Sequence, residues 1–204
     1  MPDHFSVCQL IDATPNVFVD FWARHYRDDS ESLYDTNILV KPFTDKVIMS
    51  LFEWKNGGKL SERKRTSVEQ NYTSKKDHEC VKRAIEFPHG ASADETTMFA
   101  SQFLRNDFKE GGEIWRIFWL HCCNQRFPIY DQHVHRAMVF IEEGRIEELS
   151  DFPERKIDLY LTRYLSFHRR LSGEQRKIDM ALHTFGRFIQ MWPDLCARIT
   201  ESSP

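Results

Sequence analysis

Residues 111–138 read GGEIWRIFWLHCCNQRFPIYDQHVHRAM. A glycine pair, Gly111-Gly112, precedes an apolar run from Ile114 to Cys123 that is long enough for a helix. The link Phe127-Pro128-Ile129 is rigid, and Asp131 then stands where the N-cap of a second helix belongs. A helix that is apolar almost all round is normally buried on most sides. The run at 114–123 is therefore expected at the centre of a helical domain.

Helical periodicity continues on both sides of this stretch. Seven further segments show apolar residues at helical spacing: 16–26, 44–56, 61–72, 75–87, 92–103, 157–165 and 178–189. Residues 28–37 are polar and are expected to form a loop, and Ile38-Leu39-Val40 is the only β-like segment. The sequence therefore predicts an all-α fold of roughly eight to ten helices.

Local signals predict several helix ends and one helical stripe. Thr44 is the expected N-cap of its helix, and Asn56-Gly57-Gly58 is the expected left-handed stop. Ser92 and Glu95 have the spacing of a capping box. On the first helix, the residues expected to share one face are Phe18, Phe21, Trp22 and His25.

Length and composition are those of an ordinary globular protein. With 204 residues, 41% of them hydrophobic and 29% charged, the chain suits one helical unit over 1–204. Two interleaved lobes would also fit this length, with 1–90 plus the C-terminal helices in one lobe and 91–150 as a central hairpin region. No apolar run approaches the ~20 residues of a membrane span, and the N-terminus lacks the pattern of a signal peptide. The five cysteines have no metal-ligand spacing, so we expect reduced, mostly buried thiols and a cytoplasmic, non-membrane protein.

Charge is unevenly distributed along the chain. The net charge of -3 argues against a strong nucleic-acid binder. Residues 55–87, however, hold 9 bases and 5 acids, and residues 163–187 hold 6 bases and 2 acids. These two basic sections either steer an anionic partner or are solvated helix faces.

Two features of the central stretch can carry chemistry. The glycine pair leaves the first amides of the following helix accessible, which suits a phosphate, although a plain tight turn also explains it. Asp131 should stay ionised at a helix start, where it satisfies amides. Such a carboxylate can be a structural cap alone, or it can stabilise a cationic transition state or activate a water.

Metal and thiol chemistry are not expected. His133 and His135 are two apart, which turns them about 200° from each other on a helix. Together with His121 and Asp131 they match no metal-binding motif. Cys122 and Cys123 lie in apolar surroundings and are expected to be inert. We therefore predict neither a metal site nor a cofactor.

The segment Phe127-Pro128-Ile129-Tyr130-Asp131-Gln132-His133-Val134-His135-Arg136-Ala137 resembles the helix-hairpin-helix DNA glycosylase superfamily, of the endonuclease III and adenine glycosylase type. In that family an Asp in this phrase stabilises the sugar cation or activates the attacking group, and it matches Asp131. The family's His-Val and Arg match His133-Val134 and Arg136, and its hairpin glycines correspond roughly to Gly111-Gly112.

The chain departs from the family in three ways. Its hairpin lacks the Leu-Pro-Gly-Val-Gly form, and Glu113 or Ile114 stands near the place of the lyase members' catalytic Lys. Lys109 is the nearest lysine to that place. The chain also has no C-terminal four-cysteine cluster, so no iron–sulfur centre is implied.

The resemblance implies a fold of two interleaved helical lobes and two candidate functions. The first is a monofunctional glycosylase-like hydrolase that cleaves the N-glycosidic bond of a flipped base with Asp131. DNA or another nucleic acid would be the partner, bound by Lys109, Gly111, Gly112 and Arg136. The expected pocket residues are Trp115, His121, Tyr130, His133 and His135. The alternative is a non-catalytic helical module that binds nucleic acid or a protein.

Overall fold

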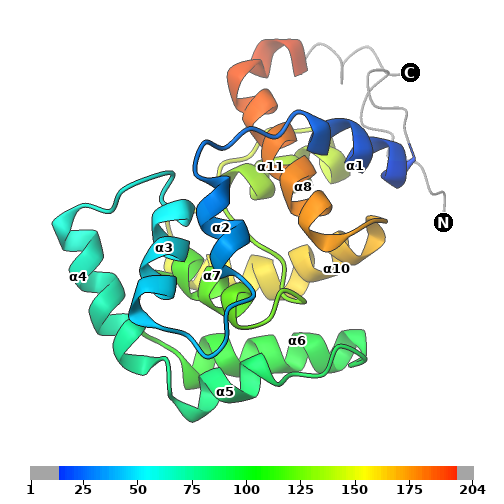
Figure 1. Cartoon of the computed structure of the whole chain (residues 1–204). Coiled ribbons are helices and arrows are strands. Elements are labelled where there is room, and N and C mark those ends of the chain that lie inside the picture. The colour runs from blue at the N-terminus through cyan, green and yellow to red at the C-terminus, as the bar shows by residue number, and fades with distance from the viewer. Residues whose placement is uncertain (1–13, 197–204) are drawn as a thin grey trace. The chain divides into compact units, whose positions relative to one another are not determined.

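The computed structural model describes residues 14–196. Within that range the chain forms eleven α-helices, three short η segments and no strand, so the all-α prediction is confirmed (Figure 1). The helices divide between two compact units. Unit 1 contains residues 14–27 and 128–196, and unit 2 contains Asp28–Phe127. The glycine turn and the helix after it therefore belong to unit 2, whereas Asp131 and its helix belong to unit 1.

Unit 1 is built around a long amphipathic helix near the end of the chain. Its elements are α1 (Pro15–Arg24), α8 (Gln132–Glu143), α9 (Pro153–Leu159), η4 (Tyr160–Tyr164), α10 (Leu165–Arg170) and α11 (Gln175–Met191). Both α1 and α8 pack along α11, as Figure 1 shows. The Phe185 ring of α11 meets Phe18 of α1 at 5.3 Å between ring centroids and Phe140 of α8 at 5.9 Å. These three buried rings are the centre of the contact.

A glycine sets the closest approach within unit 1. Gly186 of α11 lies against the backbone carbonyl of His133 in α8, and a β-carbon there would overlap that carbonyl. Glycine costs about 1 kcal/mol relative to alanine inside a helix. The close packing of α8 on α11 explains why a glycine stands at this position.

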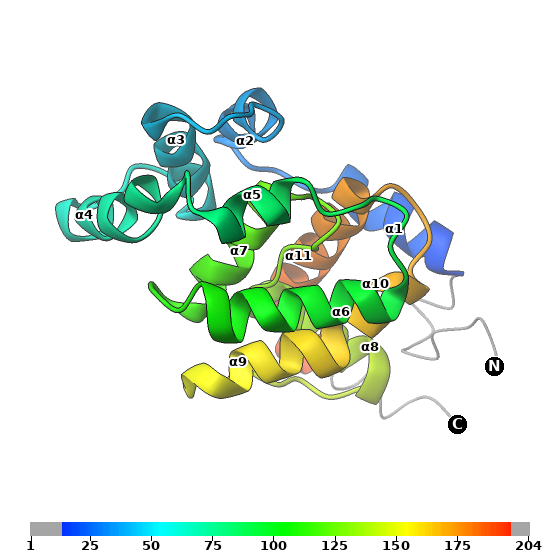
Figure 2. The same ribbon diagram turned by 90° about the horizontal axis from the view of Figure 1, so that it is seen from below.

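The segments α9, η4 and α10 follow one another without a break (Figure 2). The η4 segment is a single π turn. It directs both Tyr160 and Tyr164 inward, where their rings lie 5.8 and 4.8 Å from that of Tyr130. Because this stretch is divided into three segments, the helix count depends on how it is divided, and the eleven α-helices described agree with the roughly eight to ten predicted.

Unit 2 surrounds the apolar helix that the sequence placed at a domain centre. Its elements are α2 (Glu31–Asn37), α3 (Asp45–Lys55), α4 (Glu62–Asn71), η2 (Thr73–Lys75), α5 (Glu79–Ile85), α6 (Ala93–Gln102), η3 (Phe103–Asp107) and α7 (Glu113–Cys123). Every residue of α7 from Arg116 to Cys123 is buried. Phe52 of α3 contacts the rings of Phe118 and Trp119 in α7, at 5.5 and 6.3 Å between centroids. The prediction of a central buried helix is confirmed.

The predicted caps are confirmed as well. The Thr44 hydroxyl accepts a hydrogen bond from the amide of Val47, and Gly57 has a φ of 71° just after α3. Ser92 and Glu95 form both bonds of a capping box at the start of α6. Each of these signals acts between residues close in sequence.

One element was not expected. Residues 31–37 form α2 rather than a loop. Its side chains are held by residues far along the chain. Trp54 Nε1 donates to Glu31 Oε2 at 2.9 Å, and the buried Tyr34 ring packs on Trp54 at 4.6 Å. Tertiary contacts therefore stabilise a helix that has almost no apolar pattern of its own.

Four of the five cysteines lie in the described residues, and all four are buried and unbridged, as expected. Cys8 lies outside the described residues. Burial raises the pKa of the Cys122 and Cys123 thiols well above the usual range, because no solvent stabilises a thiolate there. These two side chains pack as small apolar groups.

Candidate functional site

Asp131 is the N-cap of α8. Its Oδ1 atom accepts hydrogen bonds from the backbone amides of His133 and Val134, both at 3.0 Å. These are two of the amides that have no partner within the helix. The half-buried carboxylate is therefore fixed in place and lies at the positive end of the helix dipole. The predicted capping role is confirmed.

His135 belongs to a buried network within unit 1. The Tyr130 hydroxyl lies 2.8 Å from His135 Nδ1, and Glu147 Oε1 lies 3.3 Å from Nε2. His135 is fully buried. Burial lowers the pKa of His135, and the nearby Glu147 carboxylate opposes that effect. The network joins the first turn of α8 to the segment after it, and it faces inward.

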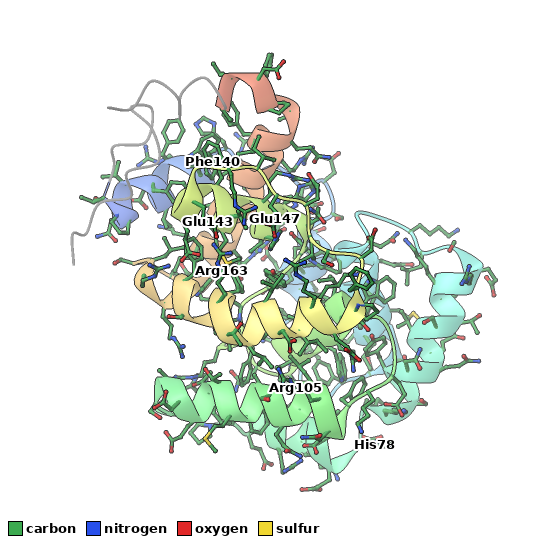
Figure 3. All side chains as sticks on the ribbon, turned by 180° about the vertical axis from the view of Figure 1, so that it is seen from behind. His78, Arg105, Phe140, Glu143, Glu147 and Arg163 are labelled. Carbon is green, nitrogen blue, oxygen red and sulfur yellow. The ribbon has the colours of Figure 1, made fainter. Side chains whose placement is uncertain are left out.

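Arginine and glutamate side chains surround this network on the outside. Glu143 and Glu147 both pair with Arg145. Arg163 of η4 forms ion pairs with Glu143 and, at 2.7 Å, with Glu142. Figure 3 shows Glu143, Glu147 and Arg163 gathered near the end of α8. These charges therefore neutralise one another on that side of unit 1.

Arg136 is also held inside unit 1, with only 1% of its surface exposed. Its guanidinium donates to both carboxylate oxygens of Glu148 at 2.8 Å and to the Gly186 carbonyl at 3.1 Å. The same Nη1 atom that donates to Gly186 also lies 3.2 Å from His133 Nδ1. The arginine therefore fixes α8 against α11 and keeps the His133 ring in place.

His133 points away from this interior. Its half-buried ring lies 4.8 Å from that of His183 in α11, at an interplanar angle of 75°. His135 is turned inward on the opposite side of α8. The two histidines thus lie on different faces of the helix, as their spacing predicts.

The glycine turn lies in unit 2. Gly111 has a φ of 83°, and a β-carbon there would overlap the hydroxyl of Tyr72, so only glycine fits. Gly112 is the N-cap of α7, with open space beside it. Carboxylates flank the turn: Glu113 lies in the first turn of α7, and Glu110 pairs with Lys75 at 2.5 Å. Lys109 is exposed beside them.

The other two predicted pocket residues are also in unit 2. His121 is buried, and both ring nitrogens have partners: Tyr34 Oη at 2.7 Å and the Phe127 carbonyl at 2.8 Å. Trp115 is half-buried and packs on Phe52 at 5.1 Å. The predicted set therefore divides evenly. Unit 1 holds Tyr130, Asp131, His133, His135 and Arg136, and unit 2 holds Lys109, Gly111, Gly112, Trp115 and His121.

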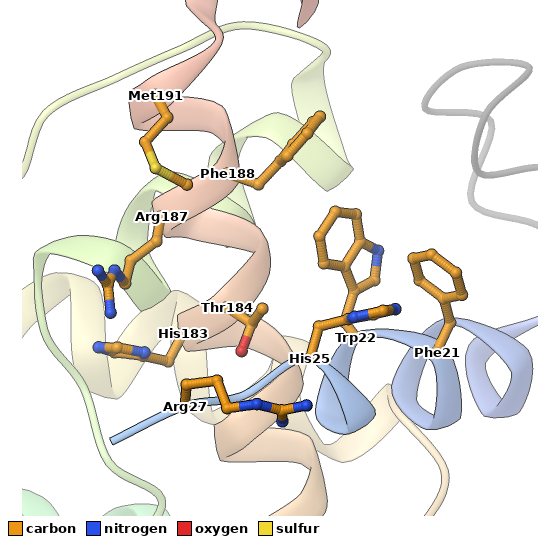
Figure 4. A pocket seen from close by; sticks show the side chains of 9 residues that line it. All are labelled: Phe21, Trp22, His25, Arg27, His183, Thr184, Arg187, Phe188 and Met191. Carbon is orange, nitrogen blue, oxygen red and sulfur yellow. The ribbon is translucent and has the colours of Figure 1, made fainter. Parts of the chain in front are cut away.

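A pocket of about 450 Å³ opens between α1 and α11 of unit 1, and sequence reasoning missed it (Figure 4). The signal was present in the stripe Phe18, Phe21, Trp22 and His25. Phe18 is buried, whereas Phe21 is 53% exposed and His25 is exposed. Helical spacing places these residues on related faces of α1, but the width of the α11 contact decides which of them are covered.

Metal-ligating clusters and membrane-spanning helices are both absent from residues 14–196. No group of three or more His, Cys, Asp and Glu side chains in that range could hold a metal ion. None of the helices described there is both long and apolar enough to cross a bilayer.

No protein-family model, no curated protein and no solved structure matches the chain.

Proposed function

We propose that the chain is a divergent DNA glycosylase-like hydrolase that cleaves the N-glycosidic bond of a flipped base. The observation that carries this proposal is the carboxylate of Asp131, held at the start of α8 by two amides. A carboxylate fixed in this way needs no reorganisation when positive charge develops nearby. The resemblance of residues 127–137 to the glycosylase phrase assigns the same residue to that role.

The chemistry asked of Asp131 is electrostatic and general-base catalysis. As the bond between the sugar C1′ and the base nitrogen breaks, its electron pair leaves with the base and the sugar becomes an oxocarbenium-like cation. A negative charge beside the sugar stabilises that cation. A water then adds to C1′, and its proton passes to the carboxylate and on to solvent. The departing base takes up a proton from solvent.

Neighbouring residues have supporting roles in this proposal. His133 and His183 lie beside the helix start and supply ring surface there. Arg136 is buried, so we assign it the positioning of α8 rather than contact with a phosphate. The phosphate contacts assigned to Lys109, Gly111 and Gly112 belong to unit 2.

The proposal is tested with Asp131→Asn on a panel of duplexes that contain damaged, modified and mismatched bases. Asparagine still accepts hydrogen bonds at an N-cap, so the fold should persist while the negative charge is lost. Asp151→Asn is the matched control, because Asp151 is an exposed aspartate of the same unit. Base release by wild type and Asp151→Asn, but not by Asp131→Asn, supports the proposal.

A second candidate is a non-catalytic nucleic-acid-binding module. It is favoured by the internal partners of the other predicted residues: His135 and Arg136 are engaged within unit 1, and capping alone accounts for one oxygen of Asp131. The two candidates differ in the panel experiment. Binding that weakens steeply with salt, together with no base release from any duplex, would favour the module.

A further inference from the structure

The pocket between α1 and α11 has one apolar wall (Figure 4). The Trp22 ring packs on Phe188 at 5.2 Å and on the buried Phe185 at 4.9 Å. Phe21 meets the edge of Trp22 at 5.2 Å, with an interplanar angle of 85°. Phe21 and Met191 are 53% and 62% exposed. Aromatic surface is therefore presented to solvent at the mouth of a defined hollow.

The remaining lining is basic. Two arginines and two histidines line the pocket, and no Asp or Glu is among its nine lining residues. These nine are Phe21, Trp22, His25, Arg27, His183, Thr184, Arg187, Phe188 and Met191. Within residues 14–196, the Arg187 guanidinium has no hydrogen-bond or ion-pair partner. Arg27 donates to the backbone carbonyls of Arg24 and Tyr26, at 2.9 and 2.6 Å. Neither of these partners is a carboxylate, so these contacts do not neutralise its charge.

A second hollow, in unit 2, differs from the α1–α11 pocket in the charges that line it. It lies beside α3 and α4 and is lined by acids and bases together. Arg65 pairs with Glu53 at 3.1 Å, and Lys76 pairs with Asp45 at 2.8 Å. Charges there neutralise one another, whereas the α1–α11 pocket keeps its arginines available to a ligand. Arg187 also ends the basic section 163–187.

We propose that the α1–α11 pocket binds one unpaired nucleotide, with its base against Phe21 and Trp22 and its phosphate at Arg187 and Arg27. Flat aromatic rings stack on nucleobases regardless of sequence, and guanidinium groups recognise phosphate. A volume of about 450 Å³ lies within the usual range for small-ligand pockets. The ligand is either a free nucleotide or a nucleotide within a single strand. The site does not require Asp131 to be catalytic.

His183 connects this pocket to the start of α8. It lines the pocket, and its ring also lies 4.8 Å from that of His133, whose amide is capped by Asp131. A nucleotide in the pocket would thus lie next to the helix start on which the proposed hydrolase depends. Binding and base release remain separate measurements, because the nucleotide contacts named above do not include Asp131.

The test uses the full-length protein and four probes: AMP, adenosine, inorganic phosphate and a fluorescein-labelled single-stranded oligonucleotide. Calorimetry measures the first three, and fluorescence anisotropy over a salt series measures the fourth. The variants are Arg187→Glu and Phe21→Ala. Their matched controls are Arg155→Glu and Phe152→Ala, which change an exposed arginine and a 75% exposed phenylalanine of the same unit outside the pocket.

The proposal expects AMP or the oligonucleotide to bind, and each pocket variant to weaken that binding by about tenfold or more. Adenosine and phosphate alone should bind more weakly than AMP. For a strand, Arg187→Glu should also reduce the salt dependence by about one phosphate contact. Binding of the oligonucleotide without AMP identifies the strand as the source. The proposal is overturned if neither AMP nor the oligonucleotide binds. It is also overturned if the control variants weaken binding as much as the pocket variants do.

Base release then separates this inference from the proposed function. If wild type releases no base while the pocket variants still lose nucleotide binding, the hydrolase proposal fails and the pocket stands. If wild type releases a base but neither pocket variant changes the binding of AMP or the oligonucleotide, the pocket proposal fails and the hydrolase stands.

Discussion

The backbone carbonyl of His133 lies directly against Gly186, so α8 and α11 meet with no room for a side chain between them. This contact fixes the first turn of α8, which Asp131 caps. It also places the His133 ring beside His183 at the edge of the α1–α11 pocket. The position of the candidate site within unit 1 therefore depends on a residue that has no functional group.

Gly186→Ala should destabilise the protein by about 1–3 kcal/mol, even though alanine favours a helix by about 1 kcal/mol. The overlap with backbone cannot be relieved by rotating a side chain, so the steric cost outweighs the propensity gain. Urea unfolding measures the change. Gly90→Ala is the control, because a β-carbon there meets nothing within 4 Å. Equal stability of the two variants would contradict the close approach.

The cap at Asp131 predicts a graded effect on stability. Asp131→Ala leaves the amides of His133 and Val134 without their partner and should cost about 0.5–2 kcal/mol. Asp131→Asn should cost much less, because an asparagine oxygen can accept the same bonds. Thermal unfolding of both variants checks the order. A loss in Asp131→Asn as large as in Asp131→Ala would show that the charge rather than the cap stabilises α8.

Because His135 is buried, we expect the stability of the folded protein to fall in mild acid. The pKa of His135 is lowered in the folded state from an ordinary value of 6.5, so below that pH the unfolded chain binds more protons than the folded one. Stability should therefore rise with pH up to about 6.5 and be lost as the pH falls below it. His135→Gln should flatten this dependence, as measured by urea unfolding between about pH 5 and 7.5.

His89→Gln is the control for that pH series. His89 is exposed, and its side chain lies outside the Tyr130–His135–Glu147 network. This variant should keep the pH dependence of wild type. A wild-type profile that is flat across the same range would contradict the buried neutral state of His135.

Glu148 supplies both carboxylate oxygens to the buried Arg136 guanidinium, although Glu148 itself is largely exposed. Glu148→Gln removes the counter-charge and should lower the free energy of unfolding by about 1–3 kcal/mol, because a buried charge loses its ionic partner. Glu154→Gln, an exposed glutamate of the same unit, should be within about 0.5 kcal/mol of wild type. Indistinguishable unfolding curves for the two variants would show that Arg136 needs no counter-charge.

The sequence predicted features whose causes are local. The caps at Thr44, Ser92 and Asp131 bond to amides two or three residues away, so their patterns are readable without a fold. The burial of α7 follows from its nearly all-apolar sequence. These features account for the all-α class and for the cap at the start of α8.

Features that depend on distant partners could not be predicted. The helix α2 is held by Trp54 and His121, which lie 23 and 87 residues from their partners in it. From the sequence alone, Arg136 would be placed facing solvent. In the structure it is held inside by a hydrogen bond to the carbonyl of Gly186, 50 residues away. Periodicity likewise could not tell that α11 covers Phe18 and leaves Phe21 exposed.

The most direct test of the central claim is single-turnover base release by wild type, Asp131→Asn and Asp151→Asn on the duplex that wild type cleaves best. The account predicts release by wild type and Asp151→Asn at similar rates. It predicts loss of release by at least about a hundredfold in Asp131→Asn, with an unfolding transition close to that of wild type. A folded Asp131→Asn protein that releases the base at the wild-type rate would contradict the account, as would a wild type that releases no base from any duplex.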